Sequence, residues 1–576
     1  MKAIFKLTLL FIFSITMSCD DENFSDPDAA ELASKSQKAT LKTLATGAAL
    51  HAANGIDIGP DGNLYVASVN GQEIAVINKN SGKIIKRFGP ASGVLGPDDL
   101  VFGPDGTLYW TDILTGYVGR MTQDGQQLGY QFVAPGVNPI AFNDEGRLFV
   151  GLDFLGDGLY ELDPNLSAPP RPIIIASAAN PYPLGFLNSF DFGTDGRLYG
   201  PLFAAGMVVS VDVDSGTAPT SDPFTDGTVR VESMGYKNPA AAKFDPQGLL
   251  TVIDQTGEVF KIDLQDLANP GDNVKTPFTT LQPGLDNMVF AKDGTLYMTN
   301  NDEGWVAEIL KSKQARIISI GGMIQPEGLA VLPGLNNQDA VFVADLFSMR
   351  QFNGTNGQQE KSYKGYLVPV PGDPIELALP MNLSADGNNI IVSSWFSSAV
   401  QVWNPNDGVL ENYTIPVPID AIRFKNGIIV SEAIVGGLIW ASDQSLIAKL
   451  TVPSGLTTDG ETVWAADWAT GKIYQLDYNG ASLEAPVEVV SGLDKPEGLA
   501  VDNEGRLVVV ETGASRLTRI DLATGIMTTL AEGLALSTPG LGEPPTWYFD
   551  GVAIGSSGDI YVSGGGTNVI YKVPKK

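Results

Sequence analysis

Cysteine, histidine and basic residues are scarce in this sequence of 576 residues. One cysteine cannot form a disulfide framework, and one histidine, His51, excludes most Ser-His-Asp triads and histidine-based metal sites. Only 36 Lys and Arg residues stand against 66 Asp and Glu residues, which gives a formal net charge of −30. A surface this acidic repels phosphate backbones and anionic lipids, so nucleic acid is a poor partner.

Material for a folded core is abundant. Hydrophobic residues make up 43% of the chain, so intrinsic disorder is not expected. The 65 glycines and 37 prolines follow no collagen-like period and suit a fold with many short strands and turns. At roughly 150 residues per domain, the length allows two to four domains.

The N-terminal residues 1–18 have the pattern of a secretory signal peptide, with two lysines and then an apolar run. The only cysteine, Cys19, follows in the tetrapeptide Thr-Met-Ser-Cys, which resembles a bacterial lipoprotein signal in which the cysteine is lipidated. An ordinary signal that contains a cysteine is the alternative. No stretch is long and apolar enough to span a bilayer. We expect an exported protein, lipid-anchored to the cell envelope (outer membrane or cell surface of a Gram-negative bacterium), with residues 19–38 as a flexible acidic stalk.

One sequence unit recurs through the rest of the chain. It consists of a polar residue, a short apolar strand, a turn such as Pro-Asp-Gly, a second strand, a loop and a third strand. Segments such as Leu64-Tyr65-Val66 have the composition of strands, and no segment has a convincing helical period. The twelve copies begin near Asn54, Asp98, Asn138, Asn188, Asn238, Asp286, Glu327, Pro380, Asp420, Ser454, Glu497 and Asp550.

A four-stranded unit that repeats every 40 or so residues is typical of a β-propeller blade. Twelve blades exceed the usual four to eight, so two propellers are required. We predict an all-β fold of two tandem six-bladed β-propellers with four-stranded blades, at residues 39–312 and 313–576. Five plus seven blades is the alternative.

The ends of the two rings need strands from elsewhere in the chain. The last repeat stops after its third strand, at residues 568–573, so its fourth strand must come from a distant segment. We expect residues 315–320 to close the second ring. We expect residues 39–44 to close the first ring against residues 306–310. Such closure removes exposed sheet edges.

The repeats resemble those of NHL-repeat and senescence-marker-protein/gluconolactonase-like six-bladed propellers. Two of the most similar blade starts are Pro326-Glu-Gly-Leu-Ala-Val331 and Pro496-Glu-Gly-Leu-Ala-Val501. The resemblance covers nearly everything from about residue 40 to the end. This scaffold carries lactonases, lyases, ester hydrolases and pure binding proteins, so the fold alone does not select an activity.

Residues that open the repeats and residues that end each second strand should meet on one face of each propeller. A ring of carboxylates and amides there offers the oxygen ligands that a hard cation such as Ca²⁺ takes, although solvated turn residues have the same composition. In the first propeller the predicted ligand-binding openers are Asn54, Asp98, Asn138, Asn188 and Asp286.

In the second propeller, Glu327, Glu497 and Asp550 open three successive blades once the ring closes. The glycine that follows each of them would let the inner strands approach closely at the axis. In gluconolactonase-like proteins, a Glu, an Asn and an Asp from such blade starts hold a divalent metal. The resemblance implies Glu327 or Glu497 as the Glu and Asp550 as the Asp. No Asn opens a blade there, and Asp420 is the oxygen ligand that could replace it.

The resemblance further implies a lactone- or ester-opening reaction with Glu497 and Asp550 as catalytic residues beside a divalent metal, which we expect to be Ca²⁺. We expect Trp395, Trp468 and Trp547 on the same face, either against a sugar-like or flat ligand or filling gaps between blades. The alternative function is a non-catalytic surface protein that binds a polysaccharide, peptide or protein. In either case we expect a monomer that meets the membrane only through its lipid anchor.

The metal content of purified residues 27–576, after dialysis without chelator, tests the enzyme hypothesis. We expect about one ion per chain, lost in the Glu497→Gln/Asp550→Asn double variant because both proposed ligands lose their charge. A protein that takes up no ion even when Ca²⁺ is offered would contradict the metal-dependent lactonase and leave the binding scaffold.

Overall fold

The computed structural model describes residues 41–216, 218–264, 273–334, 338–366, 375–537, 546 and 548–575. Cys19, the signal peptide and the acidic stalk lie outside these ranges, so export and lipid anchoring stay predictions. Trp547 also lies outside them. Within the described ranges, no helix has the length and apolar character needed to cross a membrane.

The described residues form twelve four-stranded antiparallel sheets, which confirms the all-β prediction. Second strands such as β3 (Leu64–Ser68) are buried along their whole length. Outer strands such as β29 (Gln359–Lys364) are exposed at most positions and rich in charge. This gradient explains why the second strands are rich in apolar residues, because both of their faces pack against neighbouring blades.

The strands of the first propeller run in chain order within each sheet. They are β2 (Ile56–Ile58), β3, β4 (Glu73–Ile77) and β5 (Ile84–Phe88); β6 (Pro97–Phe102), β7 (Leu108–Asp112), β8 (Tyr117–Met121) and β9 (Gln127–Phe132); β10 (Val137–Phe142), β11 (Leu148–Leu152), β12 (Gly158–Leu162) and β13 (Arg171–Ile175); β14 (Asp191–Phe192), β15 (Leu198–Leu202), β16 (Met207–Val211) and β17 (Val229–Met234); β18 (Pro239–Phe244), β19 (Leu250–Asp254), β20 (Glu258–Ile262) and β21 (Lys275–Thr280); β22 (Leu285–Phe290), β23 (Leu296–Asn300), β24 (Val306–Ile309) and β25 (Ala315–Ser319).

The second propeller has the same order except in its last sheet, which takes β1 as its fourth strand. Its strands are β26 (Leu329–Pro333), β27 (Asp339–Asp345), β28 (Ser348–Asn353) and β29; β30 (Asn382–Asp386), β31 (Asn389–Ser394), β32 (Ala399–Asn404) and β33 (Gly408–Thr414); β34 (Pro418–Phe424), β35 (Gly427–Glu432), β36 (Gly437–Trp440) and β37 (Leu446–Lys449); β38 (Pro453–Thr458), β39 (Thr462–Asp467), β40 (Lys472–Asp477) and β41 (Val487–Val490); β42 (Pro496–Val501), β43 (Leu507–Glu511), β44 (Arg516–Asp521) and β45 (Ile526–Glu532); β46 (Val552–Ile554), β47 (Ile560–Gly564), β48 (Val569–Val573) and β1 (Lys42–Thr46).

Contacts between inner strands divide the twelve blades into six plus six. Each inner strand contacts the inner strand of the next blade, and β22 contacts β2 to close the first ring. In the same way, β46 contacts β26 and closes the second ring. The five-plus-seven alternative is therefore wrong.

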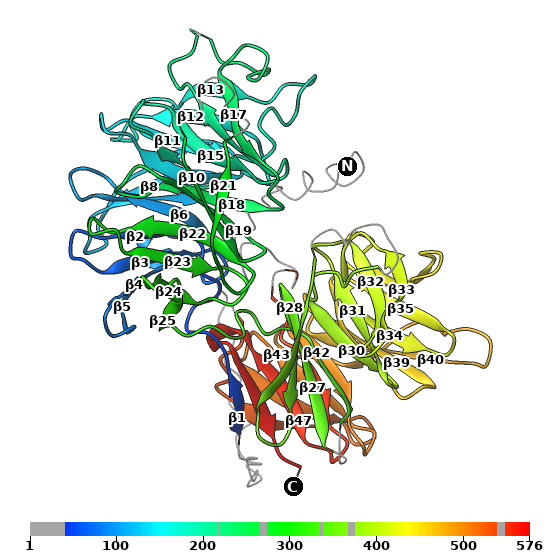
Figure 1. Cartoon of the computed structure of the whole chain (residues 1–576). Coiled ribbons are helices and arrows are strands. Elements are labelled where there is room, and N and C mark those ends of the chain that lie inside the picture. Colours follow the sequence, from blue (N-terminus) through cyan, green and yellow to red (C-terminus); the bar gives the residue numbers. More distant parts are fainter. Residues whose placement is uncertain are drawn as a thin grey trace, which may run out of the picture. The chain divides into compact units, whose positions relative to one another are not determined.

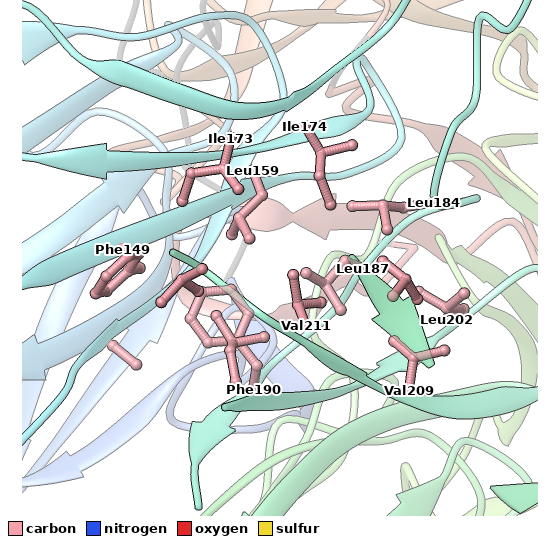
Figure 2. Close-up of a cluster of buried hydrophobic side chains, with 14 residues drawn as sticks. Phe149, Leu159, Ile173, Ile174, Leu184, Leu187, Phe190, Leu202, Val209 and Val211 are labelled. Carbon is pink, nitrogen blue, oxygen red and sulfur yellow. The ribbon is translucent and has the colours of Figure 1, made fainter. Parts of the chain in front are cut away.

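The hydrophobic core of each propeller lies between adjacent blades. Figure 2 shows one such layer, in which Phe149, Leu159 and Ile173 of the third blade meet Val209 and Val211 of the fourth. All of these side chains are buried. Burying a side chain of this size stabilises the fold by about 1.5–3 kcal/mol, so the layers between blades hold each ring together.

The predicted ring closures are wrong in both places. β25 stays in the first ring and pairs with β24, while β1 pairs with β48 in the last sheet of the second ring. In Figure 1 the blue strand β1 accordingly lies with the red strands of the C-terminal blade. A tight turn at residues 310–314 joins β24 to β25, so this local pairing has a low loop-closure cost. The first ring then has all of its strands. The sheet edge that remains free is β48 of the second ring, and β1 pairs with it.

A disulfide scan tests this exchange of strands. Lys42 on β1 lies opposite Lys572 on β48, and directly opposed residues of antiparallel strands are close enough for a disulfide. In residues 27–576, which contain no natural cysteine, we expect Lys42→Cys/Lys572→Cys to form the bond under mild oxidation. The control pair Lys42→Cys/Glu308→Cys, which reproduces the sequence-based pairing, should stay reduced. Mass spectrometry of peptides distinguishes the two results, and the opposite result would restore the original assignment.

Candidate functional site

The inner strands begin with an irregularity that frees two residues from the ladder. In β6, Pro97 pairs with Asp112 and Leu100 pairs with Trp110, so Asp98 and Asp99 together lie opposite one residue. Similar register shifts follow Val137, Leu285, Pro453 and Pro496 at the starts of four other inner strands. Such bulges turn side chains out of the regular alternation. The pairs also confirm that blade openers and second-strand ends meet on one face.

Three carboxylates of the first propeller interact at this face, and we call them the acid ring: Asp98, Asp153 and Asp286. They come from the start of β6, the residue after β11 and the start of β22. Burial and the charge of Asp99 raise the pKa of Asp98 to about 7. Burial and the charges of neighbouring aspartates hold the pKa values of Asp153 and Asp286 well above the usual range. Asp98 and Asp286 remain partly exposed.

Asp153 has an oxygen without a partner. Its Oδ1 accepts a hydrogen bond of 2.9 Å from the amide of Phe154, while Oδ2 is buried and accepts none among the described residues. The Asn138 side chain opposes the rise in the Asp153 pKa, but no hydrogen bond of normal geometry reaches Oδ2. A buried carboxylate oxygen left without a donor is energetically costly, so a missing partner is the simplest explanation.

A hydrogen-bonded polar layer adjoins the acid ring. Asn287 donates from Nδ2 to Asp99 Oδ1 at 3.0 Å, and Ser189 donates from Oγ to Asn287 Oδ1 at 3.0 Å. All three side chains are buried, and they come from the second, sixth and fourth blades. Sequence reasoning did not select them, although each directly follows a predicted opener. The layer fixes the first propeller's axis with side chains whose donors and acceptors are already used.

The amide side chains predicted to open blades form hydrogen bonds mainly with neighbouring parts of the first propeller. Asn54 donates from Nδ2 to Asn301 and accepts from the amide of Val69. Asn188 accepts from the amide of Ser189 and stays partly exposed, whereas Asn138 is buried beside Asp153. Asn138, whose side chain acts on the Asp153 pKa, is therefore the amide best placed to support the acid ring.

Four aromatic side chains form a cluster of ring contacts that begins at Phe154, the residue after Asp153, and we call them the aromatic rim: Phe154, Tyr182, Phe186 and Phe203. Phe154 and Phe186 are stacked at 5.5 Å, Phe203 meets Phe154 edge-on at 5.4 Å, and Tyr182 meets Phe186 edge-on at 5.7 Å. Phe154 and Tyr182 are 36% and 38% exposed. Sequence reasoning missed this cluster because its members belong to three different connections.

The loops that carry the rim are fixed by Asp157. This buried carboxylate accepts hydrogen bonds from the amides of Leu184, Gly185 and Phe186. Phe154 and Phe186 both have left-handed backbone conformations, with φ values of +53° and +71°. A bulky residue in this region costs of order 1–3 kcal/mol, and such strain clusters at ligand sites.

At the ends of other second strands, carboxylates accept hydrogen bonds from the backbone amides of loops. Asp112 accepts from the amides of Leu95 and Gly96, and Asp254 accepts from those of Lys237 and Asn238. Glu432, Asp467 and Glu511 make the same kind of bond to the segment before their inner strand. Because these carboxylates hold the backbone that leads into each blade, their recurrence in the sequence has a structural cause.

In the second propeller, Glu327, Glu497 and Asp550 lie within electrostatic reach of one another, as predicted. All three are buried, which raises the pKa of Glu497 to about 7 and holds the pKa values of Glu327 and Asp550 well above the usual range. Glu497 accepts from the Asp550 amide, the Trp468 indole and the Thr512 hydroxyl. Asp550 accepts from the Ser537 amide. Glu327 Oε1 accepts from Gln325, and Oε2 accepts nothing among the described residues.

Asp420 does not join this group. Its carboxylate accepts from the Ser384 hydroxyl and from the amides of Leu456 and Ala421, and so ties β34 to the neighbouring inner strands. The register of β34 matches that of β6, because Pro418 pairs with Glu432 and Ala421 pairs with Val430, as Pro97 pairs with Asp112 and Leu100 with Trp110. Asp420 therefore falls one position further into the strand than the true opener.

Of the tryptophans predicted to face a ligand, the two that the structure describes differ in burial and in contacts. Trp468 is buried, donates to Glu497 and has the Lys495 ammonium 4.7 Å from its ring centre. Trp395 is partly exposed and meets Phe396 edge-on at 5.2 Å. His51 lies outside both polar groups, with Nδ1 3.0 Å from the carbonyl of Ile324.

The predicted close approach at the glycines is confirmed. A Cβ at Gly498 would lie 2.6 Å from the Asp550 carbonyl oxygen, and one at Gly551 would lie 2.7 Å from the Cα of Gly328. A side chain at either position would force the inner strands apart. Backbone contact therefore crowds this part of the second propeller.

Among the described residues, no group of three His, Cys, Asp or Glu side chains has the geometry to hold a metal ion. The donor chemistry of Glu327, Glu497 and Asp550 suits a hard cation, but five amide, hydroxyl and indole donors already occupy these side chains. The metal stays a prediction from the family resemblance, and no reaction step is derived through it.

Comparisons with known proteins gave remote structural matches. No family model matches the chain, and no curated protein does. A streptogramin B lyase structure is 12% identical, with a TM-score of 0.37, over 53% of this chain and 95% of that one. A proposed gluconolactonase is 15% identical, with a TM-score of 0.34, over 49% and 93%. The extracellular domain of a proposed one-component system from B. thetaiotaomicron is 10% identical, with a TM-score of 0.31, over 92% and 76%. Similarity this remote assigns no activity or site residue to this chain.

The raised pKa of Asp98 predicts how stability depends on pH. The folded state holds this proton more tightly than the unfolded state, where the pKa is near 4, so the stabilisation is present below about pH 4 and is lost as pH rises through 7. Asp98→Asn, which removes the charge, should stabilise the protein by about 1–3 kcal/mol at pH 8 and by much less at pH 5. Urea unfolding at both pH values measures the difference.

Asp144→Asn is the control for this prediction, because Asp144 is exposed in the turn between β10 and β11. It should change stability little at either pH. An Asp98→Asn protein that is equally affected at pH 5 and pH 8, or destabilised at pH 8, would show that the acid ring carries no repulsive charge.

Proposed function

We propose that the chain is a ligand-binding protein whose binding site is the acid ring of the first propeller with its flanking amides and aromatic rim. The observation that carries this proposal is Asp153 Oδ2, a buried carboxylate oxygen that accepts no hydrogen bond while two partly exposed carboxylates lie beside it. An incoming donor or cation at this position would relieve both the missing hydrogen bond and the mutual repulsion.

Hydrogen bonding within each propeller supports placing the site in the first one. Glu497 and Asp550 of the second propeller are buried and already accept hydrogen bonds from neighbouring groups. In the first propeller, by contrast, Asp98 and Asp286 remain partly exposed beside the unpaired oxygen of Asp153. A ligand that reaches the two partly exposed carboxylates can also supply the hydrogen bond that the buried oxygen of Asp153 lacks.

Hydrolysis of a lactone or ester in the second propeller is a second candidate function. The observation that favours it concerns the Oε2 atom of Glu327. This buried oxygen lacks a partner and lies beside two other carboxyl groups, an environment in which a carboxyl group can serve as a general acid or base near neutral pH. The metal measurement on Glu497→Gln/Asp550→Asn, extended to turnover of lactones and esters, distinguishes this activity from binding alone.

A thermal-unfolding screen of residues 27–576 tests the binding proposal. Small amines, neutral sugars, dicarboxylates and CaCl₂ are added separately at millimolar concentration, because a ligand that binds only the folded state raises Tm. We expect at least one class to raise Tm in the wild type and to have no effect on Asp153→Asn. The matched variant Glu327→Gln, in the second propeller, should keep the response. A response lost in Glu327→Gln and kept in Asp153→Asn, or no response to any class, would contradict the assignment.

A further inference from the structure

We propose that the ligand of the first propeller is an organic cation that carries its ammonium group on a flat apolar body. The ammonium group pairs with the acid ring, and the apolar body lies against the aromatic rim. This inference rests on the proposed function and specifies the chemical class of its ligand.

The charges at the acid ring are unbalanced. The groups that act most strongly on Asp98, Asp153 and Asp286, apart from burial, include the carboxylates of Asp99 and Asp157, together with that of Asp302, which is paired with Lys364. Lys243 acts on Asp99 in the adjoining polar layer, where its ammonium group donates to the carbonyl of Phe190. A positively charged ligand group would therefore meet a local excess of negative charge, which both attracts it and sets its orientation.

An ammonium group also satisfies the hydrogen bond that is missing. It carries up to three N–H donors, and Asp153 Oδ2 is an acceptor without a donor. The adjoining layer does not supply this bond, because Asn287 Nδ2 donates to Asp99, Ser189 Oγ donates to Asn287, and neither reaches Asp153 Oδ2. A neutral hydroxyl group could donate one bond to Asp153 but would leave the repulsion among the three carboxylates unrelieved.

The aromatic rim selects the rest of the ligand. Phe154 directly follows Asp153, so the exposed ring begins one residue from the unpaired carboxylate. Partly exposed aromatic rings beside carboxylates favour cations that also have a flat apolar surface, because cation–π attraction and apolar burial act together. Asp157 holds the Phe186 loop through three backbone amides and is a positioning residue for the rim.

Calorimetric titration of residues 27–576 with 2-phenylethylamine, and in parallel with 2-phenylethanol, tests the proposal. The alcohol has the same ring and chain length but carries no positive charge at pH 7.5. We expect the amine to bind with a Kd at least tenfold lower than that of the alcohol. Tetramethylammonium, which has the charge without the ring, should bind more weakly than the amine. Higher ionic strength should weaken amine binding.

Variants separate the two parts of the site. Asp153→Asn, with Asp98→Asn as a second variant should the first misfold, should raise the Kd of the amine about tenfold. Phe154→Gly removes the ring while suiting the left-handed backbone at that residue, and should raise the Kd about fivefold. Asp144→Asn, and Phe396→Ala at an exposed ring of the second propeller, are the matched controls and should leave the Kd unchanged.

Two outcomes overturn the inference in different ways. If amine and alcohol bind equally, or if Phe154→Gly leaves the Kd of the amine unchanged, the ligand class is wrong. If the amine fails to bind while a sugar or another tested class raises Tm in an Asp153-dependent manner, the proposed function stands and this inference alone fails. If neither the amine nor any member of the Tm screen binds, both fail together.

Discussion

At the start of several inner strands, two residues fall between consecutive ladder pairs, and their side chains are released from the regular alternation of the sheet. The identity of those two residues determines which side chains lie at the centre of each propeller. Asp98-Asp99 and Asp286-Asn287 place carboxylates and a hydrogen-bonded polar layer there. Glu497-Gly498 instead places one carboxylate and a glycine that permits close backbone approach. The same backbone irregularity thus produces two different sites.

The acidic composition of the chain becomes local chemistry at these positions. Burial and mutual repulsion raise the pKa values of carboxyl groups in both propellers, because the charged form loses hydration and meets other negative charge. The second propeller offsets part of this cost with internal donors from Trp468, Thr512 and backbone amides. Each propeller leaves one buried acceptor unpaired, Asp153 Oδ2 in the first and Glu327 Oε2 in the second. Only in the first are the two neighbouring carboxylates partly exposed, and this difference makes it the better ligand site.

Much of the fold could be predicted because every blade repeats the same pattern. Alternating apolar strands and Pro-Asp-Gly turns predicted the blades, and the number of repeats predicted two rings of six. The ring ends could not be predicted correctly, because β1 and β25 are both short strands that fit either free edge. Only the tight turn between β24 and β25 decides that β25 pairs locally and that β1 completes the last blade.

The candidate site was predicted in part for the same reason. Residue type and repeat position identified Asp98 and Asp286 among the openers of one face, and Glu327, Glu497 and Asp550 among those of the other propeller. Asp153 follows a second strand, and the ends of second strands were expected on the same face. The aromatic rim could not be identified, because Phe154, Phe186 and Phe203 belong to separate connections that only folding brings together. Asp420 was misassigned because it lies one position after the opener, where Asp99 lies in β6, and its carboxylate bonds to a neighbouring inner strand. The sequence by itself determined the all-β class, the repeat and the acidic character. The tertiary structure decided which carboxylates are left unpaired, because that depends on donors contributed by distant blades.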